Sequence, residues 1–117
     1  MNKDVWDRLI QFSLDHETIS NEQEQLEWIA REPTNAAPFY NLAQLRRMQY
    51  KPEEGLALLL HAASLDASYA PAHIALAELY AVKGDYRSAW KHALLGEQYG
   101  DPQAVRMLER HAIARPS

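Results

Sequence analysis

Residues 70–103 decide the fold, and they read APAHIALAELYAVKGDYRSAWKHALLGEQYGDPQ. Pro71 suits the first turn of a helix, where a missing N–H costs nothing. Apolar residues then recur at helical spacing until Gly84, which predicts the end of that helix, and Asp85 predicts the cap of the next one. A second apolar stripe follows and stops at Gly100. The stretch therefore predicts two short helices joined by a tight turn.

Each of these helices carries one apolar face. The first stripe is Ile74, Leu76, Ala77, Leu79 and Tyr80, and the second is Tyr86, Ala89, Trp90, Ala93 and Leu94. We expect Ala77 and Ala89 to be buried where the two helices touch, because only small residues let helix backbones approach closely.

The same plan recurs in both directions along the chain, at an offset of about 34 residues. In residues 36–69, Pro52 opens the second helix of the unit; in residues 2–35 the pattern is weaker and Pro33 closes it. Leu26, Leu60 and Leu94 are equivalent under this offset and are expected in the apolar stripes. One further amphipathic helix is predicted at about 102–114, with Val105, Leu108 and Ala112 on its apolar face.

The period and the pattern resemble the tetratricopeptide repeat family, whose repeat is about 34 residues long. The third unit matches best: its large-small pair, aromatic, turn and small contact residue are Leu76-Ala77, Tyr80, Gly84-Asp85-Tyr86 and Ala89. The chain departs from the pattern at Arg8, Trp28 and Arg46, which stand in a core leucine slot, a small-residue slot and an aromatic slot.

This resemblance implies an all-α fold, a right-handed α-solenoid of about three helix-turn-helix repeats with a C-terminal capping helix. The repeats are expected at about 2–35, 36–69 and 70–103, in a single domain that spans residues 1–117. We therefore expect at least six helices and no sheet. Stacked helix pairs share a continuous core, and the terminal helix covers the last exposed face.

The resemblance also implies a concave groove lined by the first helix of each unit. The groove residues expected by analogy are Trp6, Ile10, Leu14, Tyr40, Asn41, Gln44, Arg47, Met48, Ile74, Glu78 and Val82. Such a groove is apolar with a few polar anchors and suits an amphipathic or extended peptide. The alternative that several of these residues pack between helices is equally open. A further alternative is that Arg47 and Glu78 only pair with each other or with water and that binding uses the convex face.

Composition and charge exclude several classes of function. The chain has no cysteine and a net charge of −4, and residues 1–32 alone carry −5. No basic tract favours nucleic acid, no apolar run has the length of a membrane span, and the first residues lack the apolar stretch of a signal peptide. We expect a cytoplasmic protein that binds neither nucleic acid nor membrane.

Catalytic, cofactor and metal motifs are not recognisable. The five histidines lack the spacing that aims two imidazoles at one ion, so we expect them on the surface or between helices. The glycines are isolated and form no phosphate loop. Only Asn41 falls on a position of the clamp with which some relatives hold a C-terminal carboxylate. We expect no enzyme activity, no cofactor and no metal.

The sequence leaves two functions open. The first is a protein–protein interaction module, an adaptor or scaffold that holds a peptide or helix of its partner in the groove. The alternative is a small secretion or assembly chaperone that shields a hydrophobic segment of its client. We expect a monomer or a weak homo-oligomer, since the acidic stretch 1–32 could meet Arg106, Arg110 and Arg115 at the other end.

Overall fold

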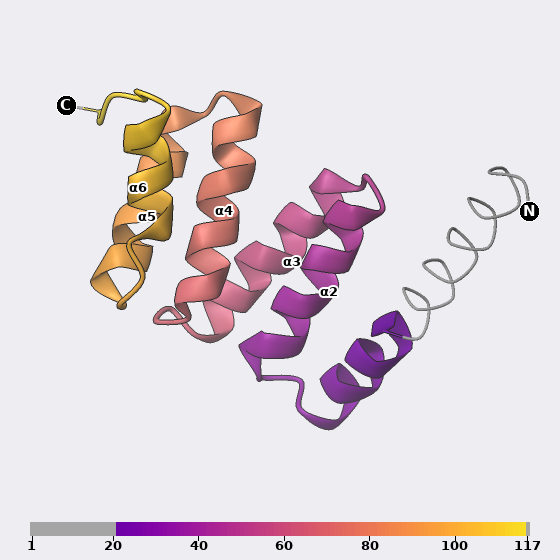
Figure 1. Ribbon diagram of the computed structural model, residues 1–117. Coiled ribbons are helices and arrows are strands. Elements are labelled where there is room, and N and C mark those ends of the chain that lie inside the picture. The colour runs from indigo at the N-terminus through magenta and orange to yellow at the C-terminus, as the bar shows by residue number, and fades with distance from the viewer. Residues whose placement is uncertain (1–20, 117) are drawn as a thin grey trace, which may run out of the picture.

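A computed structural model of the chain describes residues 21–116, and within them there are six helical segments and no strand. A helix covers residues 21–31, followed by α2 (Ala36–Met48), α3 (Pro52–Leu65), α4 (Ala70–Lys83), α5 (Tyr86–Gln98) and α6 (Gln103–Arg110) (Figure 1). The predicted all-α class is confirmed. The expected first helix of unit 2–35, with Trp6, Ile10 and Leu14, lies outside the described residues.

The starts of α3, α4 and α5 and the end of α4 lie where the sequence predicts. Pro71 lies in the first turn of α4 and Pro52 in the first turn of α3. Gly84 ends α4 in the left-handed conformation, with φ at 82°, which glycine adopts without the steric cost of a Cβ. The carboxylate of Asp85 then accepts a hydrogen bond from the backbone N–H of Ser88 at 3.2 Å, which caps α5.

The best-packed part of the core lies between α4, α5 and α6. Ala77, Ala89, Ala93 and Leu108 are all fully inaccessible to solvent, and Trp90 is 2% exposed among them. The predicted burial of Ala77 and Ala89 is confirmed. Because alanine side chains are short, α4 and α5 approach closely enough to enclose the Trp90 ring.

A second part of the core joins α2, α3 and α4 through Ala43, Leu59 and Leu76, which are all fully buried. Each helix packs against the next one along the chain, and α4 also contacts α6 (Figure 1). An ion pair connects Arg47 of α2 to Glu78 of α4. As a result α4 lies between α2 and α6 and touches both.

Three equivalent leucines do not lie where the stripes predicted. Leu26, Leu60 and Leu94 remain 47%, 42% and 39% exposed. In α3 the buried residues are Gly55, Leu59 and Ala62, so Leu60 is rotated away from them by one residue, about 100° around the helix. Leu94 has the same relation to Ala93 in α5, and Tyr86 is also half exposed.

The predicted capping helix is shorter than expected. It ends at Arg110 rather than near residue 114, and Ala112 takes a left-handed φ of 56° instead of continuing the apolar face. Ala112 is therefore exposed, while Ile113 turns back onto the core. The carbonyl of Ile113 accepts a hydrogen bond from the Trp90 indole N–H at 3.1 Å, which replaces the contact expected from residue 112.

Polar contacts attach the helix over 21–31 to α2. Arg46 forms ion pairs with Glu22 at 2.6 Å and with Glu54 of α3 at 3.2 Å, and this guanidinium holds the pKa of the Glu22 carboxyl below its usual value. None of the residues 21–31 is buried. Trp28, in the slot where a small residue was expected, stays half-buried and donates its indole N–H to Glu32 at 2.7 Å.

Candidate functional site

A hydrogen-bond network on α2 and α4 joins four of the eight predicted groove residues that lie within residues 21–116. Gln44 donates from Nε2 to the Tyr40 hydroxyl at 3.3 Å, and Arg47 donates from Nη1 to Gln44 Oε1 at 2.9 Å. The second guanidinium nitrogen, Nη2, donates to Glu78 Oε2 at 3.1 Å. Tyr40 also packs edge-on against Tyr69, with ring centroids 5.8 Å apart. The network therefore fixes the orientation of four side chains that project from two helices.

The ion pair between Arg47 and Glu78 bridges α2 and α4. Pairing of these two residues was one of the alternatives that the sequence left open. The two side chains keep 26% and 40% of their surface exposed. An ion pair with this much solvent contact stabilises a fold by only about 0–1 kcal/mol. Both groups thus remain available to a ligand that offers better hydrogen-bond geometry.

A hollow of about 440 Å³ lies above this pair and is lined by Gln44, Arg47, Met48 and Glu78. Met48 is 67% exposed, which leaves a flexible apolar side chain at the end of α2. Val82 is 86% exposed and follows Glu78 by one turn of α4, so it extends the same face toward the C-terminal end of that helix.

Asn41 and Ile74 are not part of this surface network. Asn41 donates from Nδ2 to Gln25 Oε1 at 3.1 Å, so its amide ties the helix over 21–31 to α2. Ile74 packs against the cluster around Trp90. It lies so close to Gly96 of α5 that a Cβ added there would be 3.3 Å from Ile74 Cγ1. Both residues have an interhelical role.

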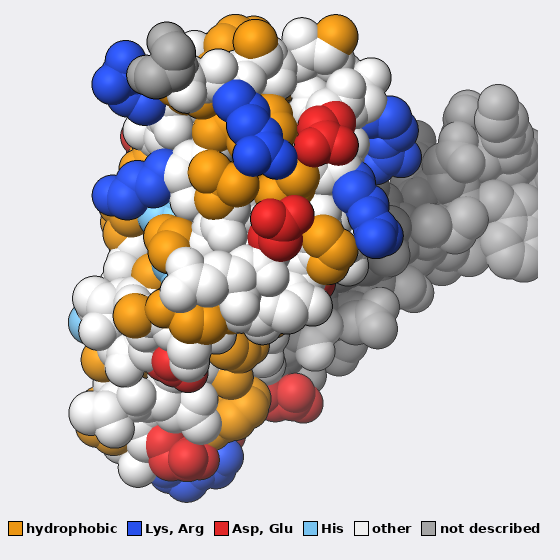
Figure 2. All heavy atoms as spheres, turned by 90° about the vertical axis from the view of Figure 1, so that its left-hand side faces the viewer, with side chains coloured by type: hydrophobic (Ala, Val, Ile, Leu, Met, Phe, Trp, Pro, Cys, Tyr) orange, Lys and Arg blue, Asp and Glu red, His pale blue; other side chains and the backbone are white. Residues whose placement is uncertain are grey.

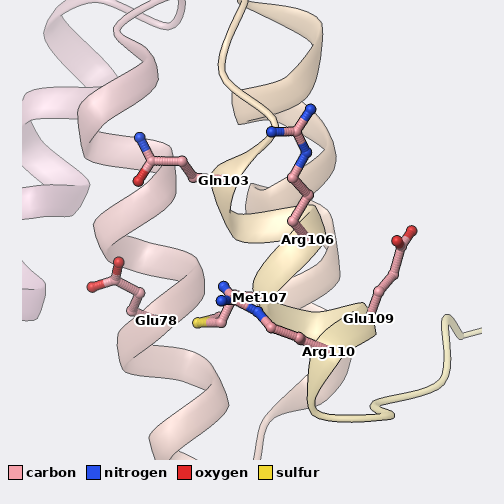
Figure 3. A pocket seen from close by; sticks show the side chains of 6 residues that line it. All are labelled: Glu78, Gln103, Arg106, Met107, Glu109 and Arg110. Carbon is pink, nitrogen blue, oxygen red and sulfur yellow. The ribbon is translucent and has the colours of Figure 1, made fainter.

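A larger cavity of about 770 Å³ lies between α4 and α6. It is lined by Glu78, Gln103, Arg106, Met107, Glu109 and Arg110. Figure 3 shows Glu78 and Gln103 on facing sides of the opening, with the Arg110 side chain extended from α6 toward Glu78 beside Met107. Because Glu78 lines both hollows, they form one surface that crosses α2, α4 and α6.

The α6 side of this surface was not identified from the sequence. The helix was predicted as a cap with Val105, Leu108 and Ala112 on its apolar face, and Arg106 and Arg110 were expected only as possible partners for the acidic stretch 1–32. A signal was nevertheless present, since Arg106 and Arg110 are four residues apart and flank Met107, which places all three on neighbouring positions of one helix. A purely solvated face has no requirement for methionine at that position.

Two buried histidines form a separate polar cluster between α4 and α5. His73 and His92 are 4% and 8% exposed, and their Nδ1 atoms are 3.1 Å apart. His73 Nε2 lies 2.8 Å from the Ala67 carbonyl, and a carbonyl oxygen only accepts, so this nitrogen donates. His73 Nδ1 is then the acceptor in the neutral ring, and His92 Nδ1 donates to it. Tyr80 stacks on His92, with centroids 5.7 Å apart.

This environment favours the neutral form of His92. Burial lowers the pKa of His92 to about 4, with further lowering by the charges of His73 and Lys91. If both rings were protonated, both Nδ1 atoms would carry a proton and the hydrogen bond between the rings would be lost. The cluster is therefore a structural contact of the kind expected for interhelical histidines. The expected surface position applies to His61, which is exposed and lies edge-on to Phe39.

Neither a metal-binding cluster nor a membrane-spanning helix occurs among the described residues. Between residues 21 and 116, no three histidine, aspartate or glutamate side chains come together so that they could hold a metal ion. In that same part of the chain, no helix combines the length and the apolar character that crossing a bilayer requires.

Comparison with known proteins adds no assignment. No protein-family model matches the chain, and no curated protein is significantly similar to it in sequence.

Proposed function

We propose that the chain is a tetratricopeptide-type solenoid whose first helices form a binding surface for another polypeptide. The proposal of a solenoid is supported by the recurrence of equivalent helices at an offset of about 34 residues and by the packing of each helix on its neighbours in chain order. The small residues Ala77 and Ala89 at the α4–α5 contact also support it. In this arrangement α2, α4 and α6 occupy equivalent places.

The proposed ligand is a peptide or a helix of a partner protein, and the proposed role is that of an adaptor or scaffold. The observation that carries this proposal is the meeting of the two hollows at Glu78, which offers a continuous surface along three helices. A surface of this extent exceeds what a small metabolite needs and suits an extended or helical segment. The proposed role involves no catalytic step.

Different residues of the surface contribute to the affinity and to the orientation of the bound segment. Met48 and Val82 offer exposed apolar area, whose burial favours association by about 25 cal/mol per Å². Arg47 and Glu78 carry opposite charges on adjacent helices and set the direction of the bound segment more than its affinity. Since Tyr40 and Gln44 already orient Arg47, little side-chain freedom is lost on binding.

The second candidate function is a small secretion or assembly chaperone. It is favoured by the exposure of Met48, Tyr50 and Val82, of which Tyr50 is 92% exposed. Flexible apolar side chains of this kind can shield varied hydrophobic segments. Co-expression separates the two functions, because a chaperone client becomes insoluble without the protein and an adaptor's partner remains soluble.

The proposal is tested by identifying the partner in a pull-down with mass spectrometry and then titrating it by calorimetry. We expect Met48→Glu and Val82→Glu each to weaken binding about tenfold or more, since each places a charge on the apolar part of the surface. Leu60→Glu on α3 is the matched control, because Leu60 is also an exposed apolar residue. Equal affinity of all three variants for the partner would place the binding site elsewhere.

A further inference from the structure

We infer that the cavity between α4 and α6 recognises a pair of side-chain carboxylates, about one helical turn apart, on the bound partner segment. This inference rests on the proposed function and specifies the chemistry of the ligand at one end of the surface.

The charges around the cavity leave an excess of cations. The acidic residues that line it are already engaged: Glu78 pairs with Arg47 at 3.1 Å and Glu109 with Arg115 at 3.5 Å. Within residues 21–116, Arg106 and Arg110 take part in no ion pair and in no side-chain hydrogen bond. The lining itself holds two arginines and two glutamates, and Arg47 and Arg115, the partners of the glutamates, add two further positive charges beside it.

The spacing of the two arginines defines the ligand. Residues four apart on an α-helix are separated by about 6 Å along its axis, so the Arg106 and Arg110 side chains leave α6 one turn apart. Figure 3 shows Arg110 extended toward α4 and Arg106 extended along α6. Acidic residues at i and i+4 of a partner helix have the same spacing, and those at i and i+2 of an extended segment are about 6.6 Å apart. Each guanidinium can bind a carboxylate through two parallel N–H donors.

The other lining residues suit the main chain and the apolar part of such a segment. Met107 lies between the arginines in sequence and lines the same cavity, and Gln103 can both donate and accept a hydrogen bond. Figure 2 faces the end of the molecule that α5 and α6 form, and it shows Lys and Arg side chains beside exposed hydrophobic ones. An amphipathic acidic segment matches this mixture of surface types.

The number of carboxylates that the cavity can bind favours acidic side chains over a C-terminal carboxylate as the ligand. A chain terminus supplies one carboxylate, whereas the cavity has two free arginines on one helix. The proposal therefore commits to internal acidic side chains, and a ligand that must have a free C-terminus would contradict it.

The test is a selection from a library of random twelve-residue peptides displayed on phage. The peptides are joined to the coat protein through their C-termini, so that no ligand has a free C-terminal carboxylate. We expect the recovered peptides to be enriched in aspartate and glutamate at spacings of two or four. As synthetic amidated peptides, they should bind the Arg106→Gln/Arg110→Gln double variant at least about tenfold more weakly. Arg87→Gln is the matched control, because Arg87 is an exposed arginine of α5 outside the cavity.

The remaining outcomes separate this inference from the proposed function. Peptides without acidic enrichment, or acidic peptides that bind the double variant with unchanged affinity, would overturn the inference and leave the groove as a peptide site. If no peptide is recovered, both proposals fail. Circular dichroism of each variant verifies folding, and the single substitutions supply the same test if the double variant does not fold.

Discussion

Two regions of the molecule are held together by different forces, although both are helical. The region of α4, α5 and α6 is joined through fully buried alanines around Trp90. The region of the helix over 21–31 and α2 is joined through the Arg46–Glu22 ion pair and the Asn41–Gln25 hydrogen bond, and none of the residues 21–31 is buried. The comparison teaches that helical periodicity alone does not produce tight packing. Small residues are also needed where the helices cross.

The largest expected difference between the regions concerns their tryptophans. We expect Trp90→Ala to lower the free energy of unfolding by about 3–5 kcal/mol, because it leaves a cavity in a core where the ring is 2% exposed. Trp28→Ala should cost less than about 1 kcal/mol, since Trp28 is only half-buried. Chemical denaturation measures both values. Similar losses in the two variants would show that the regions are packed alike.

The next difference concerns overpacking at helix contacts. Ala77→Leu and Ala89→Leu should each cost about 1–3 kcal/mol, because there is no free volume around either fully buried side chain. Ala30→Leu is the control in the first region, where residue 30 is exposed, and should change stability by less than about 0.5 kcal/mol. Thermal unfolding at the same protein concentration measures the stability of the three variants. An unchanged melting temperature in Ala77→Leu would refute the alignment of the repeats.

These two sets of residues also show what the sequence could predict. The starts of α3 and α4 and the α4–α5 turn followed from Pro52, Pro71 and Gly84-Asp85, because these residues restrict the backbone locally. The end of α6 could not be predicted in the same way. Ala112 adopts a left-handed φ that its side chain does not favour, and the tertiary contact of Ile113 with Trp90 stabilises it.

The site was predictable only in part, for a related reason. Tyr40, Gln44, Arg47 and Glu78 were expected on one surface, and they form one network. Ile74 had the spacing of a groove residue, but the close approach of α5 at Gly96 gives it a packing role. The α6 cavity depends on how far α6 stands from α4, which a single sequence does not specify.

A smaller effect is expected from pH, and it is confined to the region of α4 and α5. The pKa of folded His92 is about 4, below the ordinary value of 6.5, so the unfolded chain binds more protons between these values. The free energy of unfolding is therefore highest above pH 6.5 and decreases as the pH falls toward 4, because protonation of His92 favours the unfolded chain. We expect a loss of about 1–2 kcal/mol between pH 7 and pH 5, because partial solvent contact reduces the full linkage value.

Denaturant titrations at pH 7 and pH 5 measure this loss, and few carboxylates titrate in that range. His92→Gln should remove most of the pH dependence. His61→Gln should retain it, since His61 is exposed. If stability is the same at both pH values in the unmodified protein, the burial of His92 does not favour its neutral form.

The smallest effect is expected where the first region is attached. Arg46→Gln removes the ion pairs with Glu22 and Glu54, and the global cost should stay below about 1 kcal/mol because such pairs are partly solvated. The local consequence is larger. Hydrogen exchange in residues 21–31 should become faster, whereas α4 to α6 should be unaffected. Exchange that accelerates equally in both regions would mean that the chain unfolds as one cooperative unit.

The central claim is that one partner segment lies across α2, α4 and α6, and the methionine methyl groups test it most directly. Met48 lines the hollow next to α2 and Met107 lines the cavity next to α6, so the two methyl groups report on the two ends of the surface. The protein is labelled with ¹³C at the methionine methyls, their signals are assigned with Met48→Leu and Met107→Leu, and the identified partner peptide is titrated by NMR. We expect both signals to shift along the same binding curve. A peptide that binds and saturates while either signal stays in place would contradict the claim.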